Sequence, residues 1–366
     1  MPIYMDIHTL PGVNAGLVAQ AHQQDLIHQD EYGCKCMTYW IDEERETVFC
    51  LIDAPNKAVV SQLHQRSHGL IPNKIIEVDG AIVSSFLGRI FDPEAAEISP
   101  DGLKVFSDPS FRILIVTSVT DDNLLRYRLG VDKANEYLQS HNTILRKNLA
   151  LHGGREAEYK GNGFIISFTS AAKAIACAIA IRQEMQKAHA DTLDFRIAIN
   201  AGEPIEKSNK LFGDTIQFAS NMCAVAGNFQ IAVASSVKDL AAKDLFLNKS
   251  EELLILTPQD EILLQLLFSK LEENWQDADF DLADYCQATA MSTSQLYRKT
   301  TSLTGSSPNV LLKDFRLEKA KELLKKRHYS IAQVTFDSGF ASASYFTKCF
   351  KKKYGLLPMA YLDLLQ

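Results

Sequence analysis

Two histidines, His64 and His68, lie four residues apart in KAVVSQLHQRSHG, a segment with a helical pattern. Side chains at positions i and i+4 project from one face of a helix, so both imidazoles could bind one transition metal. His8 ends an expected N-terminal strand, and Cys50 lies in a later strand. If the strand face that carries His8 and Cys50 packs under this helix, the four residues form a metal site. Nickel, copper or zinc would accept these ligands.

Other interpretations of the same residues remain open. Histidines on amphipathic helices usually face solvent or form hydrogen bonds, and a cysteine in an apolar strand is usually part of the core. A cavity for an organic ligand is the competing kind of sensor. Cys34 and Cys36 alternate on one strand face, and a redox role for them is a further alternative.

Near the C-terminus, two segments share one layout, which is a short helix, a turn and a longer polar helix. In the first segment we expect Leu296 and Leu303 to point inward. In the second we expect Val334 and Phe336 on the apolar face and Gly339 in the turn. Polar and basic side chains at the start of such a second helix reach base edges and phosphates in the major groove. The predicted DNA-contacting residues are Ser294, Gln295, Arg298 and Lys299 in the first unit, and Ser342, Ser344, Tyr345, Thr347 and Lys348 in the second.

The charge distribution along the chain agrees with a polyanionic partner. The net charge of the chain is −7, but residues 290–366 carry 13 Lys and Arg against 5 Asp and Glu. This segment therefore has a local charge of +8, which leaves −15 for residues 1–289. An acidic body with a basic end indicates that this end meets nucleic acid.

A chain of 366 residues is longer than one core usually serves, and its patterns predict three domains. Residues 1–88 follow the order strand, helix, strand, strand, helix, strand, which is that of a ferredoxin-like domain. Residues 89–110 contain three prolines and are predicted to be a linker. Residues 111–250 form a second α+β unit, and residues 260–366 show helical periods only. The fold class is therefore multidomain α+β plus all-α.

The C-terminal segment closely resembles the AraC family of transcription regulators. The phrases that carry the resemblance are RLEKAKELL and SIAQVTFDSGFASASYFTKCFKKKYGLLP, including Gly355 and Pro358. The resemblance implies a DNA-binding domain with two helix-turn-helix units and double-stranded DNA as a partner.

The middle segment resembles the catalytic domain of class III nucleotide cyclases in YKGNGFIISF, FRIAINAGEP and LFGDTIQFASNMCAVAGNFQIAVASSV. That family holds its metal ions on two carboxylates, and the corresponding positions here are Thr117 and Asn162. Its catalytic Asn and Arg correspond to Gln217 and Asn221. The resemblance therefore implies a cyclase-like fold without the catalytic groups, so we expect no enzyme activity. We expect this domain to form a homodimer, with binding of a nucleotide effector as an alternative.

The N-terminal segment resembles a small bacterial ferredoxin-like family that includes nickel-binding members. The matching phrases are DIHTLPG, MTYWIDEERETVFCLIDAP and HQRSHGLIPNKIIEV. This resemblance adds support to the metal site predicted from the histidines and Cys50.

Together these features predict a transcription regulator that responds to an effector, with a transition metal such as nickel as the first candidate. Regulation by an organic or nucleotide effector, an active cyclase fused to a DNA-binding domain, and a metal store or chaperone are the alternatives. The N-terminus lacks the pattern of a secretory signal, and no apolar run reaches the roughly 18 to 20 residues of a membrane span. We therefore expect a cytoplasmic protein without a membrane partner.

Overall fold

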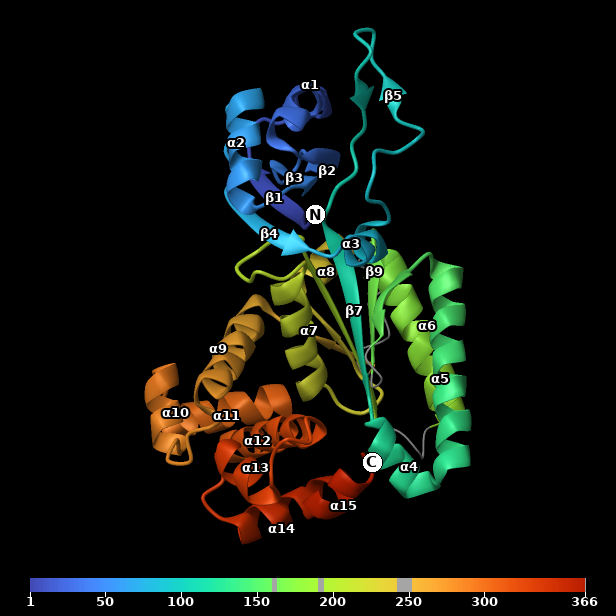
Figure 1. The fold of residues 1–366 in the computed structure, drawn as a ribbon. Helices are drawn as coiled ribbons and strands as arrows, with labels where there is room; N and C mark the ends of the chain where they lie inside the picture. The colour runs from blue at the N-terminus through green and yellow to red at the C-terminus, as the bar shows by residue number, and fades with distance from the viewer. Residues whose placement is uncertain (160–162, 190–193, 242–251, 366) are drawn as a thin grey trace.

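The computed structural model describes residues 1–159, 163–189, 194–241 and 252–365 (Figure 1). It shows two sheet-containing domains followed by a bundle of helices, which confirms the predicted fold class. Among the described residues, no helix is long and apolar enough to cross a membrane.

The N-terminal domain has the predicted ferredoxin-like order. Its antiparallel sheet has the strand order β2-β3-β1-β4, and helices α1 and α2 pack on one face of it (Figure 1). The elements are β1 (Ile3–Thr9), α1 (Ala15–His28), the 3-10 helix η1 (Gln29–Tyr32), β2 (Lys35–Asp42), β3 (Thr47–Asp53), α2 (Lys57–Ser67) and β4 (Lys74–Val78). Tyr4 and Ile52 point toward the helices, whereas Met5, Phe49 and Leu51 point to the opposite face. Successive strand residues face opposite sides of a sheet, so both faces of this sheet contribute to apolar cores.

Two features after β4 differ from the sequence analysis. Helix α3 (Gly80–Leu87), which was not predicted, packs against the middle domain. The predicted linker of residues 89–110 contains a short hairpin, β5 (Glu97–Ile98) and β6 (Lys104–Val105). It returns to the N-terminal sheet, where the ring of Phe106 stacks on Tyr39 with a centroid distance of 4.1 Å. The two ends of the segment are thus attached to the first domain, while the hairpin between them projects away from it (Figure 1).

The middle domain is built on a six-stranded mixed sheet with the order β12-β11-β10-β7-β9-β8. Helices α5 and α6 cover one face and α7 covers the other (Figure 1). Its elements are β7 (Arg112–Val119), α4 (Asp122–Leu129), α5 (Val131–His152), β8 (Arg155–Tyr159), β9 (Phe164–Phe168), α6 (Ala171–His189), β10 (Phe195–Gly202), α7 (Gly213–Val225), β11 (Ile231–Val233), α8 (Ser235–Leu240) and β12 (Leu253–Ile255). The edge strand β12 lies beyond residue 250, where the sequence analysis ended this domain.

The C-terminal part is helical from residue 258 onward. Its helices are α9 (Pro258–Asn274), α10 (Leu282–Thr289), α11 (Thr293–Thr304), α12 (Pro308–Lys325), α13 (Ile331–Asp337), α14 (Ala343–Tyr354) and α15 (Pro358–Asp363). Helices α10 and α11 form one helix-turn-helix unit, α13 and α14 form another, and α12 joins them (Figure 1). Thr257 and Asp260 form a capping box at the start of α9, which fixes where this helix begins.

The N-terminal and middle domains are joined by cationic side chains that bind backbone carbonyls. The Nζ atom of Lys74 in β4 donates to the carbonyl oxygens of Glu206, Lys207 and Ser208 at 2.9, 2.6 and 2.6 Å. The guanidinium group of Arg112 donates to the carbonyl of Phe86 in α3 at 3.2 Å. These hydrogen bonds connect the two domains, and the bond of Arg112 also satisfies a buried carbonyl.

The second helix-turn-helix unit rests on α4 of the middle domain. Leu124 of α4 is buried in the same apolar cluster as Phe346, Phe350 and Tyr361. The carboxylate of Asp121 accepts from Nζ of Lys325 and from the hydroxyl of Tyr361. Burial raises the pKa of Asp121, but the hydrogen bond and charge of Lys325 outweigh it and lower that pKa. The contact therefore combines an apolar side chain with a charged hydrogen bond.

We expect Leu124→Ala to destabilise this contact by about 2–5 kcal/mol, the usual cost of truncating a buried leucine. The thermal unfolding midpoint should fall. Limited proteolysis should release the C-terminal helices from the middle domain faster. Leu151→Ala is the matched control, because Leu151 is 70% exposed. Unchanged proteolysis and an unchanged midpoint for Leu124→Ala would show that the unit does not rest on α4.

Candidate metal centre and nucleic-acid interface

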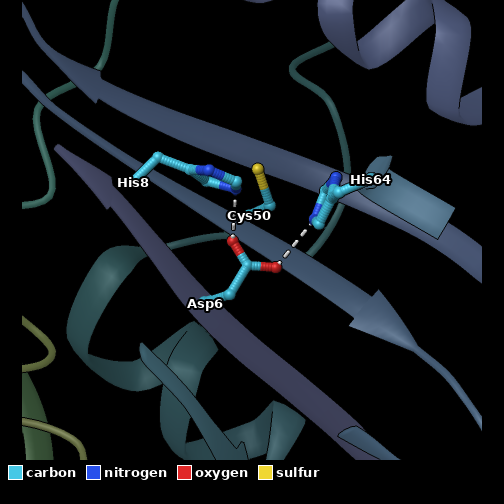
Figure 2. A group of neighbouring side chains, drawn as sticks. All are labelled: Asp6, His8, Cys50 and His64. Carbon is cyan, nitrogen blue, oxygen red and sulfur yellow. Dashed lines mark hydrogen bonds and ion pairs between the residues drawn. The ribbon is translucent and has the colours of Figure 1, made fainter. Parts of the chain in front are cut away.

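A buried carboxylate, that of Asp6 in β1, lies between two histidines (Figure 2). Its Oδ1 atom is 3.1 Å from Nε2 of His8, and its Oδ2 atom is 3.0 Å from Nε2 of His64. Asp6 and His8 share one face of β1 because they are two residues apart. His64 reaches them from α2, which packs over this face.

Cys50 completes the group. In the pairing of β1 with β3, Asp6 is directly opposite Cys50, so both side chains point to the helix side of the sheet. Asp6, His8, Cys50 and His64 each offer one ligand atom, and these four atoms all lie within 4.8 Å of one another. Figure 2 shows the sulfur of Cys50 between the two imidazoles.

A second group adjoins the first through His64. Nδ1 of His64 is 3.2 Å from Oδ2 of Asp25 in α1, and Nε2 of His68 is 3.4 Å from the same oxygen. The two imidazoles are themselves 3.0 Å apart at the nearest nitrogens. Asp25, His64 and His68 also offer one ligand atom each, and these three atoms lie within 4.8 Å of one another. His64 is therefore shared between two sets of ligand atoms.

The charges in this cluster depend on one another. Burial raises the pKa of Asp6, but the charge and hydrogen bonds of His64 and His8 outweigh it and lower that pKa to about 2. For His64, burial lowers the pKa, whereas the two aspartates raise it to about 10. Burial and the nearby carboxylates raise the pKa of Cys50 well above its usual value. The cluster thus holds two carboxylates, a thiol and an imidazolium.

The donor set fits a transition metal. Imidazole, thiolate and carboxylate are the ligands by which proteins hold nickel, copper and zinc. Asp6 and Asp25 place two carboxylates in buried positions, and a divalent cation would offset their negative charge. Such a metal would be held by Asp6, His8, Cys50 and His64, and it would replace protons on its imidazole and thiol ligands.

The structure brings together three of the four residues predicted as ligands, His8, Cys50 and His64, and places His68 in the adjoining group. The sequence analysis did not predict Asp6 or Asp25 as ligands. Asp6 could have been identified from the sequence as a candidate ligand, because it is a charged residue inside the apolar strand IYMDIH. The redox alternative for Cys34 and Cys36 loses support, because burial raises the pKa of both thiols and a reactive cysteine needs a lowered one.

In the first helix-turn-helix unit, the predicted DNA-contacting residues lie on the exposed face of α11. Ser294, Gln295, Arg298 and Lys299 are exposed, while Leu296 and Leu303 are buried as predicted. Gln295 also closes a capping box with Ser292, since its Oε1 atom accepts from the Ser292 amide at 3.1 Å. The side chain of Gln295 is thus hydrogen-bonded at the start of the helix. Arg298 is the next long polar side chain along the same face, and it is exposed.

In the second unit, Ser344, Tyr345 and Lys348 are exposed on α14, and Thr347 is half-buried. The hydroxyl of Ser342 caps the helix by accepting from the amide of Tyr345. The placement of Phe336 on the apolar face was wrong, because its side chain is 57% exposed, whereas Val334 is buried. Helix α13 is only seven residues long, so one buried stripe suffices to anchor it.

One arginine ties the two units together. Arg316 of α12 donates to the carbonyls of Trp275 and Phe280 at 3.0 and 3.3 Å, and also to that of Asp277. Gly339 in the second turn has a φ of +74°, and a Cβ there would lie 2.1 Å from the carbonyl oxygen of Trp275. The second turn therefore packs directly on the entry to the first unit, which gives the pair a fixed relative orientation.

The cyclase-like domain uses its altered positions for structure. The hydroxyl of Thr117 accepts from the backbone amide of Phe164 at 2.9 Å. Gln217 donates to Asn221 at 3.1 Å on the surface of α7. Asn162 lies outside the described residues. Thr117 and Asn221 are therefore neutral hydrogen-bonding residues at positions where the cyclase family has a carboxylate and an arginine.

Two helix-turn-helix units on one connecting helix define a double helix-turn-helix DNA-binding domain. Residues 285–363 match the family model described as Helix-turn-helix domain, and this part of the chain is an AraC-type domain. Residues 4–78 match the model described as Nickel responsive protein SCO4226-like, so the N-terminal domain is of the SCO4226-like type.

Several known proteins are similar to parts of the chain. Histidine kinase P4 of Formosa agariphila is 34% identical over 102 residues, which are 28% of this chain and 7% of that protein. The HTH-type transcriptional regulator MtrA of Neisseria gonorrhoeae is 34% identical over 99 residues, 27% of this chain and 31% of that protein. The solved adenylate/guanylate cyclase/hydrolase from Silicibacter pomeroyi is 23% identical with a TM-score of 0.31, covering 35% of this chain and 78% of that one. The chain spans less than a third of the length of both curated relatives.

In metal-free protein we expect His64→Gln to destabilise the N-terminal domain by about 3–5 kcal/mol, the usual cost of breaking a buried ion pair. The substitution removes the positive charge that lies between Asp6 and Asp25. Urea unfolding followed by tryptophan fluorescence in a Trp275→Phe background measures the change, because the signal then comes from Trp40, which is buried in this domain. His28→Gln is the control, since His28 pairs with the exposed Glu31 and such pairs contribute little. Equal unfolding curves for both variants would mean that His64 carries no charge.

Proposed function

We propose that this chain is a cytoplasmic transcription regulator that binds double-stranded DNA through its two helix-turn-helix units and responds to a transition metal bound by its N-terminal domain. The observation that carries the proposal is the buried Asp6, His8, Cys50 and His64 cluster in a chain that ends in an AraC-type domain. Nickel is the first candidate metal, because the matching family model is described as nickel responsive. Copper and zinc fit the same ligands.

The domains take separate parts in this proposal. Residues 1–88 form the sensor, residues 89–110 connect it, residues 111–250 form the cyclase-like domain, and residues 260–366 bind DNA. The cyclase-like domain acts as a homodimer contact and not as an enzyme. The neutral groups at Thr117 and Asn221 support the absence of catalysis, because magnesium and a triphosphate need charged partners.

Packed contacts offer a route from the metal centre to the DNA-binding helices. In the pairing of β1 with β4, Ile7 is opposite Lys74, next to the strand residues that hold the cluster. Lys74 binds the carbonyls of residues 206–208, which lead into α7, and α7 packs against α9. A metal regulates DNA binding only if it binds more tightly to one arrangement of these parts than to another.

Nickel titration of the purified full-length protein tests the metal site. We expect one nickel per chain, and Cys50→Ala should weaken nickel binding about tenfold or more. Cys286→Ala is the matched control, because Cys286 is partly buried in α10, far from the cluster along the chain. Nickel should also change the affinity for operator DNA, selected from random sequences, by about 5-fold to 150-fold, the usual range of allosteric coupling. Nickel uptake without any change in DNA affinity would fit a metal store and would remove the sensor role.

Substitutions on the exposed helix faces test the DNA interface. Arg298→Ala should cost about 1–3 kcal/mol and relax base preference at one position, as expected for loss of a base contact. Lys348→Ala should weaken binding to all sequences alike and reduce its salt dependence, as expected for loss of a phosphate contact. Lys133→Ala removes an exposed charge on α5 and serves as the control. Fluorescence anisotropy at several salt concentrations measures these effects, and unchanged affinity in both variants would place the interface elsewhere.

A further inference from the structure

A cavity of about 540 Å³ opens between α1 and the helix-facing side of the N-terminal sheet. Sites for small organic molecules usually have volumes of about 300–1,000 Å³. Most of its wall is apolar and comes from α1, the loop before it and the sheet, including Leu10, Val13, Leu17, Val18, Ala21 and Val48. A bare metal ion needs no such space, so the cavity calls for a second occupant.

One end of the cavity is the metal cluster itself. His8, Cys50, Asp25 and His68 line the cavity and also belong to the two groups of candidate ligands. Nδ1 of His8 and Oδ1 of Asp25 are buried and have no hydrogen-bond partner among the described residues. Both side chains are only 3% exposed. Buried polar atoms without partners are costly, so a bound molecule that supplied partners would be stabilised here.

Another part of the cavity wall connects to the middle domain. Tyr39, which pairs with Cys50 across β2 and β3, lines the cavity, and its ring stacks on Phe106 from the segment that follows β6. Asp108 of the same segment accepts from the Ile41 amide at 3.0 Å, and Arg112 begins β7 a few residues later. A molecule in the cavity would therefore touch a wall that the connecting segment supports.

We propose that this cavity binds a small organic molecule with an apolar body and a nitrogen or oxygen donor at one end, and that the donor binds the metal held by the cluster. The inference rests on the proposed metal site. The apolar walls select the body of the molecule, and the cluster selects its donor end. The effector is then a metal together with an organic ligand, and each raises the affinity for the other.

Two imidazole probes test this inference on the full-length protein. Nickel uptake is measured first, and the nickel-loaded protein is then titrated with 4-phenylimidazole and with imidazole by calorimetry and by the visible absorption of nickel. Both probes carry the same donor, but only 4-phenylimidazole has an apolar body to bury. We expect it to bind about tenfold or more tightly than imidazole, since burial of a phenyl ring is favourable. We also expect this binding to require nickel.

A variant that fills the cavity provides the matched test. Ala21→Trp should remove the preference for 4-phenylimidazole and leave nickel uptake unchanged, because Ala21 lines the cavity and is not a candidate ligand. Ala95→Trp, at an exposed position in the connecting segment, should keep the preference. Nickel uptake and the thermal midpoint show whether each variant is folded.

The outcomes separate this inference from the proposed function. Equal affinity of the wild type for the two probes, or equally tight binding of 4-phenylimidazole without nickel, would overturn the inference and leave the metal site standing. If the wild type takes up no nickel, copper or zinc, the proposed metal site and the inference both fail. Retention of the preference in Ala21→Trp would place the apolar contact outside this cavity.

Discussion

The N-terminal domain depends on keeping the carboxylate of Asp6 charged in a buried position between the sheet and the helices that cover it. An isolated buried carboxylate is far too costly, so cationic or hydrogen-bonding partners must lie against both of its oxygens. The imidazole of His8, from the same strand, lies against Oδ1, and the imidazole of His64, from α2, lies against Oδ2. This requirement fixes the position of α2 over β1, and Asp25 of α1 then stabilises the second nitrogen of His64. The result is a compact group of metal-binding atoms beside an apolar cavity.

Cationic side chains connect the three parts of the molecule by ending on oxygen atoms of the next part. Lys74 and Arg112 bind carbonyls across the boundary between the N-terminal and middle domains, and Lys325 binds Asp121 across the boundary to the C-terminal helices. Such contacts are directional, because each donor must meet a fixed set of acceptors. One apolar cluster contains residues of all three parts. A second cluster joins Leu124 of the middle domain to the C-terminal helices. A change of conformation in one part therefore has defined contacts through which it can affect the others.

In the middle domain, residues at the positions that correspond to catalytic residues of cyclases make local hydrogen bonds. Thr117 stabilises the β7 and β9 pair by binding a backbone amide, and Gln217 pairs with Asn221 on the helix surface. These residues satisfy local hydrogen bonds, which is enough to maintain the sheet and its helices. Because fold and function are separable, the architecture of this domain does not by itself assign it an activity.

The sequence alone determined the ferredoxin-like order of the N-terminal elements, the two helix-turn-helix units, and the presence of His8, Cys50 and His64 on faces that could meet. Strand and helix periods decide which side chains share a face, and so Leu296 and Val334 were placed correctly. Only the tertiary structure decided which faces meet. The register of β1 with β3 put Asp6 opposite Cys50, and the docking of α1 brought in Asp25 and left the cavity beside them. It also left Phe336 exposed and folded the connecting segment back on Tyr39. Local periodicity contains no information about these long-range pairings, because they depend on how separate elements pack.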